Sequence, residues 1–145
     1  MSSRRIIFHL GLWLGVFAFW LFVTRGHHPS MIVAASATAV LVSAFALAVY
    51  VNSLFLQPRF ATRRLWLQYL ASLLATIVVL DLITVLLIQL LYDFAGVPRE
   101  VRYGFLFNMA SDGAGIILHV AAAMFVMWLV KHLRRKGEAR RPAGG

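Results

Sequence analysis

Four long runs of apolar residues, separated by short polar connections, dominate the pattern along this chain. The longest covers residues 65–92 and holds a single charged side chain, Asp81, near its middle. As a helix it would extend roughly 42 Å, enough to cross a hydrocarbon core of about 30 Å. The other runs cover residues 6–24, 31–55 and 113–130. The pattern predicts an all-α integral membrane protein, a four-helix transmembrane bundle with up-down-up-down order.

Composition agrees with one membrane domain, predicted at residues 1–135, and a basic flexible cytoplasmic tail at residues 136–145. Hydrophobic residues make up 61% of the chain and charged residues only 13%, about half the usual charged share. A secretory signal also begins with a basic head and an apolar run, but residues 6–24 are long and lack a small-residue cleavage site. We therefore expect a retained first span.

Proline and glycine mark the expected ends of the spans. Pro58, in the connection at residues 56–64, is a predicted helix breaker. In the longest connection, residues 93–112, Pro98 can begin a short interfacial helix. The alternative is that the fourth span begins early, around Phe105. A helix from Pro98 to Leu133 would be roughly 54 Å long, too long to cross without interruption, so we expect a break at residues 111–115.

Small side chains give the first two spans faces that can approach another helix closely in lipid. The first span offers Gly11 and Gly15. The second offers two such faces, one made of Ala35, Ala39 and Ser43, and the other of Ala37, Ala44 and Ala48.

Lysine and arginine are distributed unevenly between the two predicted sides of the membrane. One side holds Arg25, Arg99 and Arg102, and the remaining residues of the 14 lie with the two termini and the second connection. The positive-inside rule therefore predicts that both termini are cytoplasmic. The inner-face anchors to anionic lipid headgroups are Arg59, Arg63, Arg64, Lys131, Arg134 and Arg135. The net charge of +9 thus points to membrane lipids as partners and not to nucleic acid.

A carboxylate deep in a membrane is costly and normally faces protein or water. Helical spacing places Thr84, Ile88 and Tyr92 on the same face as Asp81. His119 lies at a similar depth in the fourth span, with Asp112 seven residues before it on the same face. These residues, Asp81, Thr84, Asp112 and His119, form the candidate intramembrane polar site. Two interpretations stay open: a proton or ligand site, in which Asp81 and His119 could pair, or a protonated acid hydrogen-bonded between helices.

Other chemistry finds little support in the sequence. The chain has no cysteine, which excludes disulfides and thiolate metal sites. A haem would need two histidines at matching depth, whereas His9 lies near the inner edge and His119 deeper. His27 and His28 are two adjacent residues in a turn, which we interpret as solvated and not as a metal site. No catalytic motif is present, so we expect a protein that is not an enzyme and holds no cofactor or metal.

One stretch, Tyr50–Phe60 with the sequence YVNSLFLQPRF, followed by Trp66 to Leu70, resembles a known family. It is similar to the four-helix membrane region of bacterial sensor histidine kinases that are partnered with LytTR-type regulators. Such regions typically open with an aromatic-rich first helix after a histidine, as His9 and Trp13 do here. Their second helix typically runs into a Leu-x-Pro-Arg-Phe turn, which residues 56–60 match, with basic residues and a Tyr-Leu pair following.

The resemblance implies a location in the bacterial inner membrane and a role as the sensor region of a signalling pathway. Residues 1–145 contain no phosphoacceptor His-Phe-x-x-Asn segment, so we expect either an input module separated from its kinase domains or an orphan relative, with no catalytic residue to transfer. Three functions stay open: a non-catalytic signal-input or partner-binding module, a small structural subunit of a larger membrane complex, and a small proton or solute transporter built on Asp81 and His119. The corresponding partners are a signalling protein, a membrane-complex subunit or a second copy of the chain.

Overall fold

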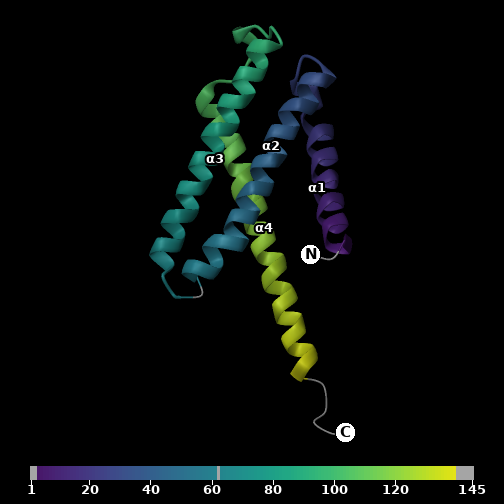
Figure 1. Ribbon diagram of the computed structural model, residues 1–145. Helices are drawn as coiled ribbons and strands as arrows, with labels where there is room; N and C mark the ends of the chain where they lie inside the picture. Colours follow the sequence, from purple (N-terminus) through teal and green to yellow (C-terminus); the bar gives the residue numbers. More distant parts are fainter. Residues whose placement is uncertain (1–2, 62, 140–145) are drawn as a thin grey trace.

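The computed structural model describes residues 3–61 and 63–139, and no strand occurs among them. Four long helices form the molecule (Figure 1). They are α1 Ser3–Thr24, α2 Met31–Val51, α3 Trp66–Phe94 and α4 Phe105–Ala139. Three short helical segments lie between them: η1 Arg25–His27, η2 Asn52–Ala61 and η3 Arg99–Val101.

Each long helix has the length and composition of a membrane span. The spanning segments are Ile6–His27, Met31–Ala61, Trp66–Phe94 and Phe105–Leu133. The described part of the chain is therefore a four-helix protein compatible with a multi-pass membrane bundle, which confirms the coarse fold prediction. The predicted tail beyond Ala139 and the side chain of Arg134 lie outside the described residues.

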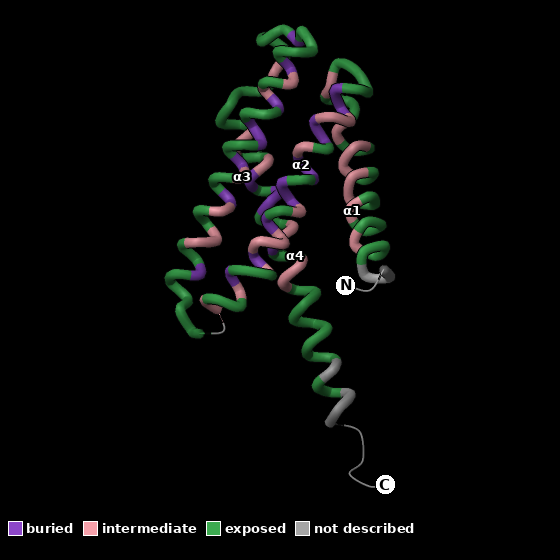
Figure 2. Tube along the Cα trace, in the orientation of Figure 1, coloured by how far each residue is buried: buried purple, intermediate pink, exposed green. Residues whose placement is uncertain are grey.

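The helices pack unequally. α2 is in contact with α1, α3 and α4, and α3 also packs against α4. No residue in the most apolar window of the first span is buried, whereas half of the corresponding window of the second span is buried. Figure 2 shows this contrast along the trace. Helices α2, α3 and α4 thus form the core of the bundle, and α1 packs against the outer side of α2.

Two ends of the molecule can be distinguished in Figure 1. We call them the η1/η3 end, at the top of the view, and the η2 end, at the bottom. α1 begins and α4 ends toward the η2 end, and the lower half of α4 extends past the α2–α3 connection. From Phe125 to Leu133 this half of α4 is exposed throughout.

The core depends on close approach of α2 and α4. Phe45 of α2 and Ile116 of α4 are fully buried between the helices. Of the two predicted small-residue faces of α2, the buried one is the face made of Ala37, Ala44 and Ala48. Phe45 packs directly on Gly115, where a Cβ atom would lie 2.8 Å from its ring. By contrast, a Cβ at Gly11 or Gly15 of α1 would meet nothing within 4 Å, so these glycines mediate no contact within the described chain. 

Two predicted interruptions are wrong. α4 begins at Phe105 and continues through residues 111–115 without a break, and only the short η3 segment follows Pro98. Gly113 and Gly115 lie within the helix, where they face Asp81 and Phe45. A side chain at either position would crowd these neighbours, so the glycines serve helix packing and not a helix break. Pro58 does not end the second helix either. Pro58 lies inside the π-helix η2. The i→i+5 hydrogen bonds of a π-helix replace the i→i+4 bonds of the α-helix, which proline disrupts.

A buried hydrogen bond joins η2 to α3. The Tyr69 hydroxyl donates to Asn52 Oδ1 over 2.8 Å, and both side chains are almost completely buried. Both residues belong to the stretch that carries the family resemblance. The turn between them is tight, because Arg64 adopts a φ of 59°, a left-handed conformation that is uncommon outside glycine.

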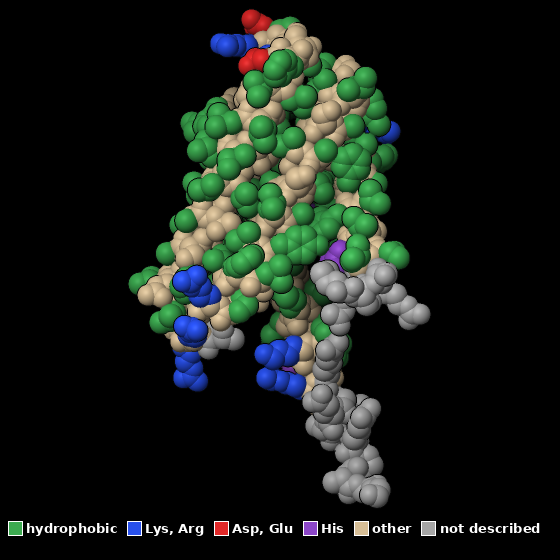
Figure 3. Space-filling model, in the orientation of Figure 1, with side chains coloured by type: hydrophobic (Ala, Val, Ile, Leu, Met, Phe, Trp, Pro, Cys, Tyr) green, Lys and Arg blue, Asp and Glu red, His purple; other side chains and the backbone are tan. Residues whose placement is uncertain are grey.

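Basic side chains gather at the η2 end, while acids and the other arginines lie at the η1/η3 end (Figure 3). Of the predicted inner-face anchors, Arg59, Arg63, Arg64, Lys131 and Arg135 are all exposed. The surface between the two ends is dominated by apolar side chains. This charge segregation is what the positive-inside argument requires of a membrane-spanning bundle.

Candidate functional site

A cavity of about 270 Å³ lies at the η1/η3 end, between all four helices. Nine of its lining side chains are polar: Thr24, His27, His28, Thr38, Tyr92, Tyr103, Asn108, Ser111 and Asp112. The others are Val23, Ala37, Leu41, Ile88 and Phe107. So many polar groups in one space are unusual for a bundle otherwise built from apolar side chains, and we take this cavity as the candidate site.

Two histidine–tyrosine pairs frame the cavity. The Tyr92 hydroxyl and His28 Nδ1 share a hydrogen bond of 2.9 Å, and the Tyr103 hydroxyl and His27 Nδ1 share one of 3.2 Å. Each pair joins the α1–α2 turn to the second half of the chain. The two histidines are therefore bound to tyrosines across the cavity, which the prediction of a solvated turn did not anticipate.

His28 carries the clearest electrostatic perturbation outside the spanning segments. Burial lowers the pKa of His28 below its ordinary value of 6.5, and the neighbouring His27 lowers this pKa further. The imidazole consequently stays neutral at neutral pH and brings no positive charge to the cavity.

The lowered pKa of His28 predicts a pH-dependent stability. The stabilisation is fully present above about pH 6.5 and is lost as the pH falls through the lowered pKa, because unfolded His28 takes up its proton first. We expect the melting temperature of the protein in detergent to fall between about pH 7.5 and about pH 5. His28→Gln should reduce this fall. His132→Gln, which changes an exposed histidine near the other end, should keep it, and equal falls in both variants would contradict the assignment.

One carboxylate lines the cavity and a second lies close to it. Asp112 lines it directly and is partly buried. Asp81 is 5% exposed and points at α4 beside Asp112, since a Cβ at Gly113 would lie 3.1 Å from its Oδ2. Asp81 Oδ1 has no hydrogen-bond partner among the described residues. The two acids are near enough to interact electrostatically.

The predicted polar site is therefore only partly assembled. Asp81 and Thr84 lie on one buried face of α3 with Ile88 and Tyr92, as their spacing predicts. The Thr84 hydroxyl donates to the Leu80 carbonyl oxygen over 2.7 Å, within its own helix. Asp81 and Asp112 come together, but no hydrogen bond joins Asp81 to His119 in the described chain.

His119 is engaged elsewhere. Its Nδ1 donates to the Gly115 carbonyl oxygen over 2.8 Å, and Trp20 Nε1 donates to its Nε2 over 3.4 Å. The ring also stacks on Phe45, with 4.1 Å between centroids. Both nitrogens are thus occupied and the pairing with Asp81 does not form. His119 instead lines a separate, mainly apolar groove of about 440 Å³ between α1, α2 and α4.

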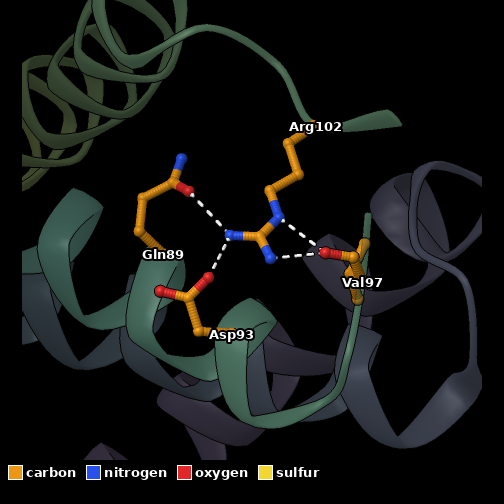
Figure 4. A network of polar contacts seen from close by, with 4 residues as sticks. All are labelled: Gln89, Asp93, Val97 and Arg102. Carbon is orange, nitrogen blue, oxygen red and sulfur yellow. Dashed lines mark hydrogen bonds and ion pairs between the residues drawn. The ribbon is translucent and has the colours of Figure 1, made fainter. Parts of the chain in front are cut away.

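Arg102 closes the α3–α4 connection beside the cavity (Figure 4). It donates from Nε to the Val97 carbonyl oxygen over 3.0 Å, with a second bond from Nη2 to the same oxygen. Its Nη1 forms an ion pair with Asp93 at 2.7 Å and a hydrogen bond to Gln89 at 3.4 Å. The guanidinium is thereby committed to the connection and is not available as a counter-ion for Asp112.

Removing this clamp should loosen the connection. In Arg102→Met the bonds to Val97, Asp93 and Gln89 are lost, and a hydrogen bond to a charged group makes a net contribution of about 1.5–3 kcal/mol. We expect backbone amides at residues 95–104 to exchange hydrogen at least about tenfold faster. Arg99→Met removes an exposed arginine from the same connection and serves as the matched control. Equal exchange in the two variants would show that Arg102 does not hold the connection.

Sequence reasoning missed the cavity itself. Its polar residues come from four separated segments, so only the tertiary arrangement brings them together. Among the described residues, no group of three or more histidine, aspartate or glutamate side chains is placed to hold a metal ion. Comparison with protein-family models, with curated proteins and with solved structures finds no match for this chain.

Proposed function

We propose that this chain is a non-catalytic protein of the bacterial inner membrane, with four spans in up-down-up-down order and both termini cytoplasmic. In this proposal it acts as a signal-input or partner-binding module. The cavity at the η1/η3 end faces outward and receives the signal, and α4 carries the response to the cytoplasmic side, where a signalling protein or a second copy of the chain responds.

The observation that supports this proposal is the continuity of α4. Asn108, Ser111 and Asp112, in its first turns, line the cavity, and the same uninterrupted helix ends in an exposed basic segment beyond the bundle. At 35 residues it extends about 52 Å. A rigid helix transfers a shift at one end to the other, because its backbone hydrogen bonds resist bending. The resemblance to sensor-kinase membrane regions agrees with such a role.

The transmission can be tested with a fluorophore on a single cysteine. The chain has no cysteine of its own, so Lys136→Cys gives a unique label at the exposed end of α4. Ser111→Trp, which fills the cavity, should change the emission of that label in nanodiscs. Ala110→Trp places the same side chain on the neighbouring exposed position, outside the cavity lining, and should leave the emission unchanged. Identical spectra for both variants would contradict transmission through α4.

A second candidate function, a subunit of a larger membrane complex, is favoured by one surface feature. A shallow apolar groove of about 330 Å³ runs between α2 and α3 and is lined partly by small side chains, including Ala39, Ser43 and Ala44. Such a surface allows a further helix to approach closely in lipid. Purification of the chain from its native membrane should then yield a stable second protein, and replacement of Ser43 by leucine should release it. Isolation of the chain alone would argue against this function.

A further inference from the structure

The cavity at the η1/η3 end has the chemistry of a site for a positively charged ligand. Among its described lining residues, Asp112 is the one carboxylate, and there is no lysine or arginine. Asp81 lies against Gly113, next to Asp112 in the chain, and adds a second carboxyl group that is 5% exposed and has no partner for Oδ1 among the described residues. A buried acid left without a hydrogen-bond partner is rare and calls for an explanation, such as a bound group.

Among the described residues, the cations near these acids have other partners. Arg102 is committed to Val97, Asp93 and Gln89. Arg25 is exposed and lies over the Phe22 ring at 4.7 Å. His28 is neutral at neutral pH for the reasons given above. Asp112 therefore has no cationic partner among the described lining residues, and an anionic ligand would meet a carboxylate instead of a counter-ion.

The remaining walls favour an organic cation. The cavity is lined by the aromatic side chains of Tyr92, Tyr103 and Phe107, and the faces of such rings attract ammonium groups. Tyr103 and Phe107 stack on each other with 5.0 Å between centroids, and the Arg102 guanidinium lies 5.6 Å from the centre of the Tyr92 ring, so one face of each ring is already covered. Hydroxyl and amide oxygens of Thr24, Thr38, Asn108 and Ser111 can accept hydrogen bonds from such a group. With about 270 Å³, the space lies just below the range of roughly 300–1,000 Å³ that is usual for drug-sized ligands. Exposed His27, Tyr103 and Ser111 on its rim leave it reachable from the surface.

We propose that this cavity binds a small organic ammonium ion, with Asp112 as its counter-ion, Asp81 as a second carboxyl group near Asp112, and aromatic rings around its apolar part. This inference rests on the proposed function in taking the cavity as the input site, and it names the class of ligand. Binding places the ammonium group against Asp112, where carboxylate and cation neutralise each other out of water. No covalent step is involved.

The test uses protection of a cysteine in the cavity. Ser111→Cys in the full chain, held in nanodiscs, reacts with a maleimide at a rate that measures access to the site. Butylammonium should slow this reaction in a saturable way, whereas butanol at the same concentration and sodium chloride at the same ionic strength should not. Gly104→Cys, at the same end but outside the lining, should show no protection.

Substitutions of acidic residues then test whether the protection by butylammonium depends on Asp112. Asp112→Asn should weaken butylammonium protection about tenfold or more. Glu100→Gln removes an exposed acid from the same end and should leave it unchanged. Equal protection by sodium would show an inorganic cation site, and equal protection by butanol an apolar space. Either result, or no protection by butylammonium in the Ser111→Cys chain, would overturn the proposal whether or not Asp112→Asn folds.

The same samples separate this inference from the proposed function. The label at Lys136→Cys reports transmission, while cysteine protection reports binding. Protection without a change at Lys136 would leave the ammonium site standing and contradict transmission through α4. A response of the Lys136 label to Ser111→Trp, with no protection by butylammonium, would leave the input function standing and overturn the ammonium site.

Discussion

Gly115→Leu is expected to destroy the contact between α2 and α4. A Cβ at this position would already lie 2.8 Å from Cζ and 3.0 Å from Cε1 of Phe45, distances at which something must move. Phe45 cannot retreat easily, because it is fully buried, stacked on His119 and in edge contact with Trp20. Overpacking of this kind costs about 1–3 kcal/mol for smaller insertions, so we expect a loss of at least about 3 kcal/mol. Thermal unfolding in detergent, followed by circular dichroism, measures it.

The matched control is Gly15→Leu in α1. A Cβ there meets nothing within 4 Å, and the residue is exposed on the outer surface of the bundle. The same substitution should therefore change the melting temperature little. A similar loss in both variants would mean that leucine acts on helix propensity or on expression and not on the Phe45 contact.

Asp81→Leu is expected to make the protein more stable. Asp81 is 5% exposed, and its Oδ1 lacks a partner among the described residues. A buried polar group without a hydrogen bond costs about 1–3 kcal/mol, and leucine removes this cost. We expect the free energy of unfolding in detergent to rise by that amount. Acids inside membrane spans are usually retained for function, so the same variant should weaken the protection by butylammonium described above, by less than Asp112→Asn does.

Thr84→Val is the control for this prediction. Thr84 lies on the same buried face of α3, but its hydroxyl already donates to the Leu80 carbonyl oxygen. Replacing it should leave stability unchanged or slightly lower. A destabilised Asp81→Leu protein would show that Asp81 holds the helices together, which is the structural interpretation left open by the sequence.

The helices themselves could be predicted from the sequence because their cause is local. Apolar runs of spanning length mark the four helices, and the observed helices begin or end within a few residues of most predicted limits. The buried face of Asp81, Thr84, Ile88 and Tyr92 also follows from helical spacing alone. The alternative start of the fourth span near Phe105 is confirmed, since α4 begins at that residue.

The contacts between helices could not be predicted in this way. Glycine breaks a helix in one setting and admits a neighbouring side chain in another, and only the position of Phe45 and Asp81 shows which applies to residues 111–115. His119 and Asp81 have similar depth, but depth does not give the rotation of a helix, and His119 turns toward Trp20 and Phe45. The pairs His27–Tyr103 and His28–Tyr92 join residues far apart in the chain, so no local pattern indicates them.

The orientation of the bundle in the membrane decides the proposed function, because the cavity can receive an external signal only if the η1/η3 end faces outward. Single cysteines in the cysteine-free chain allow this to be measured with a membrane-impermeant maleimide on intact bacterial cells. We expect that Gly26→Cys and Gly104→Cys are labelled in intact cells, while Leu65→Cys and Lys136→Cys are labelled only after the membrane is opened. The reverse pattern, or labelling of all four in intact cells, would contradict an outward-facing cavity.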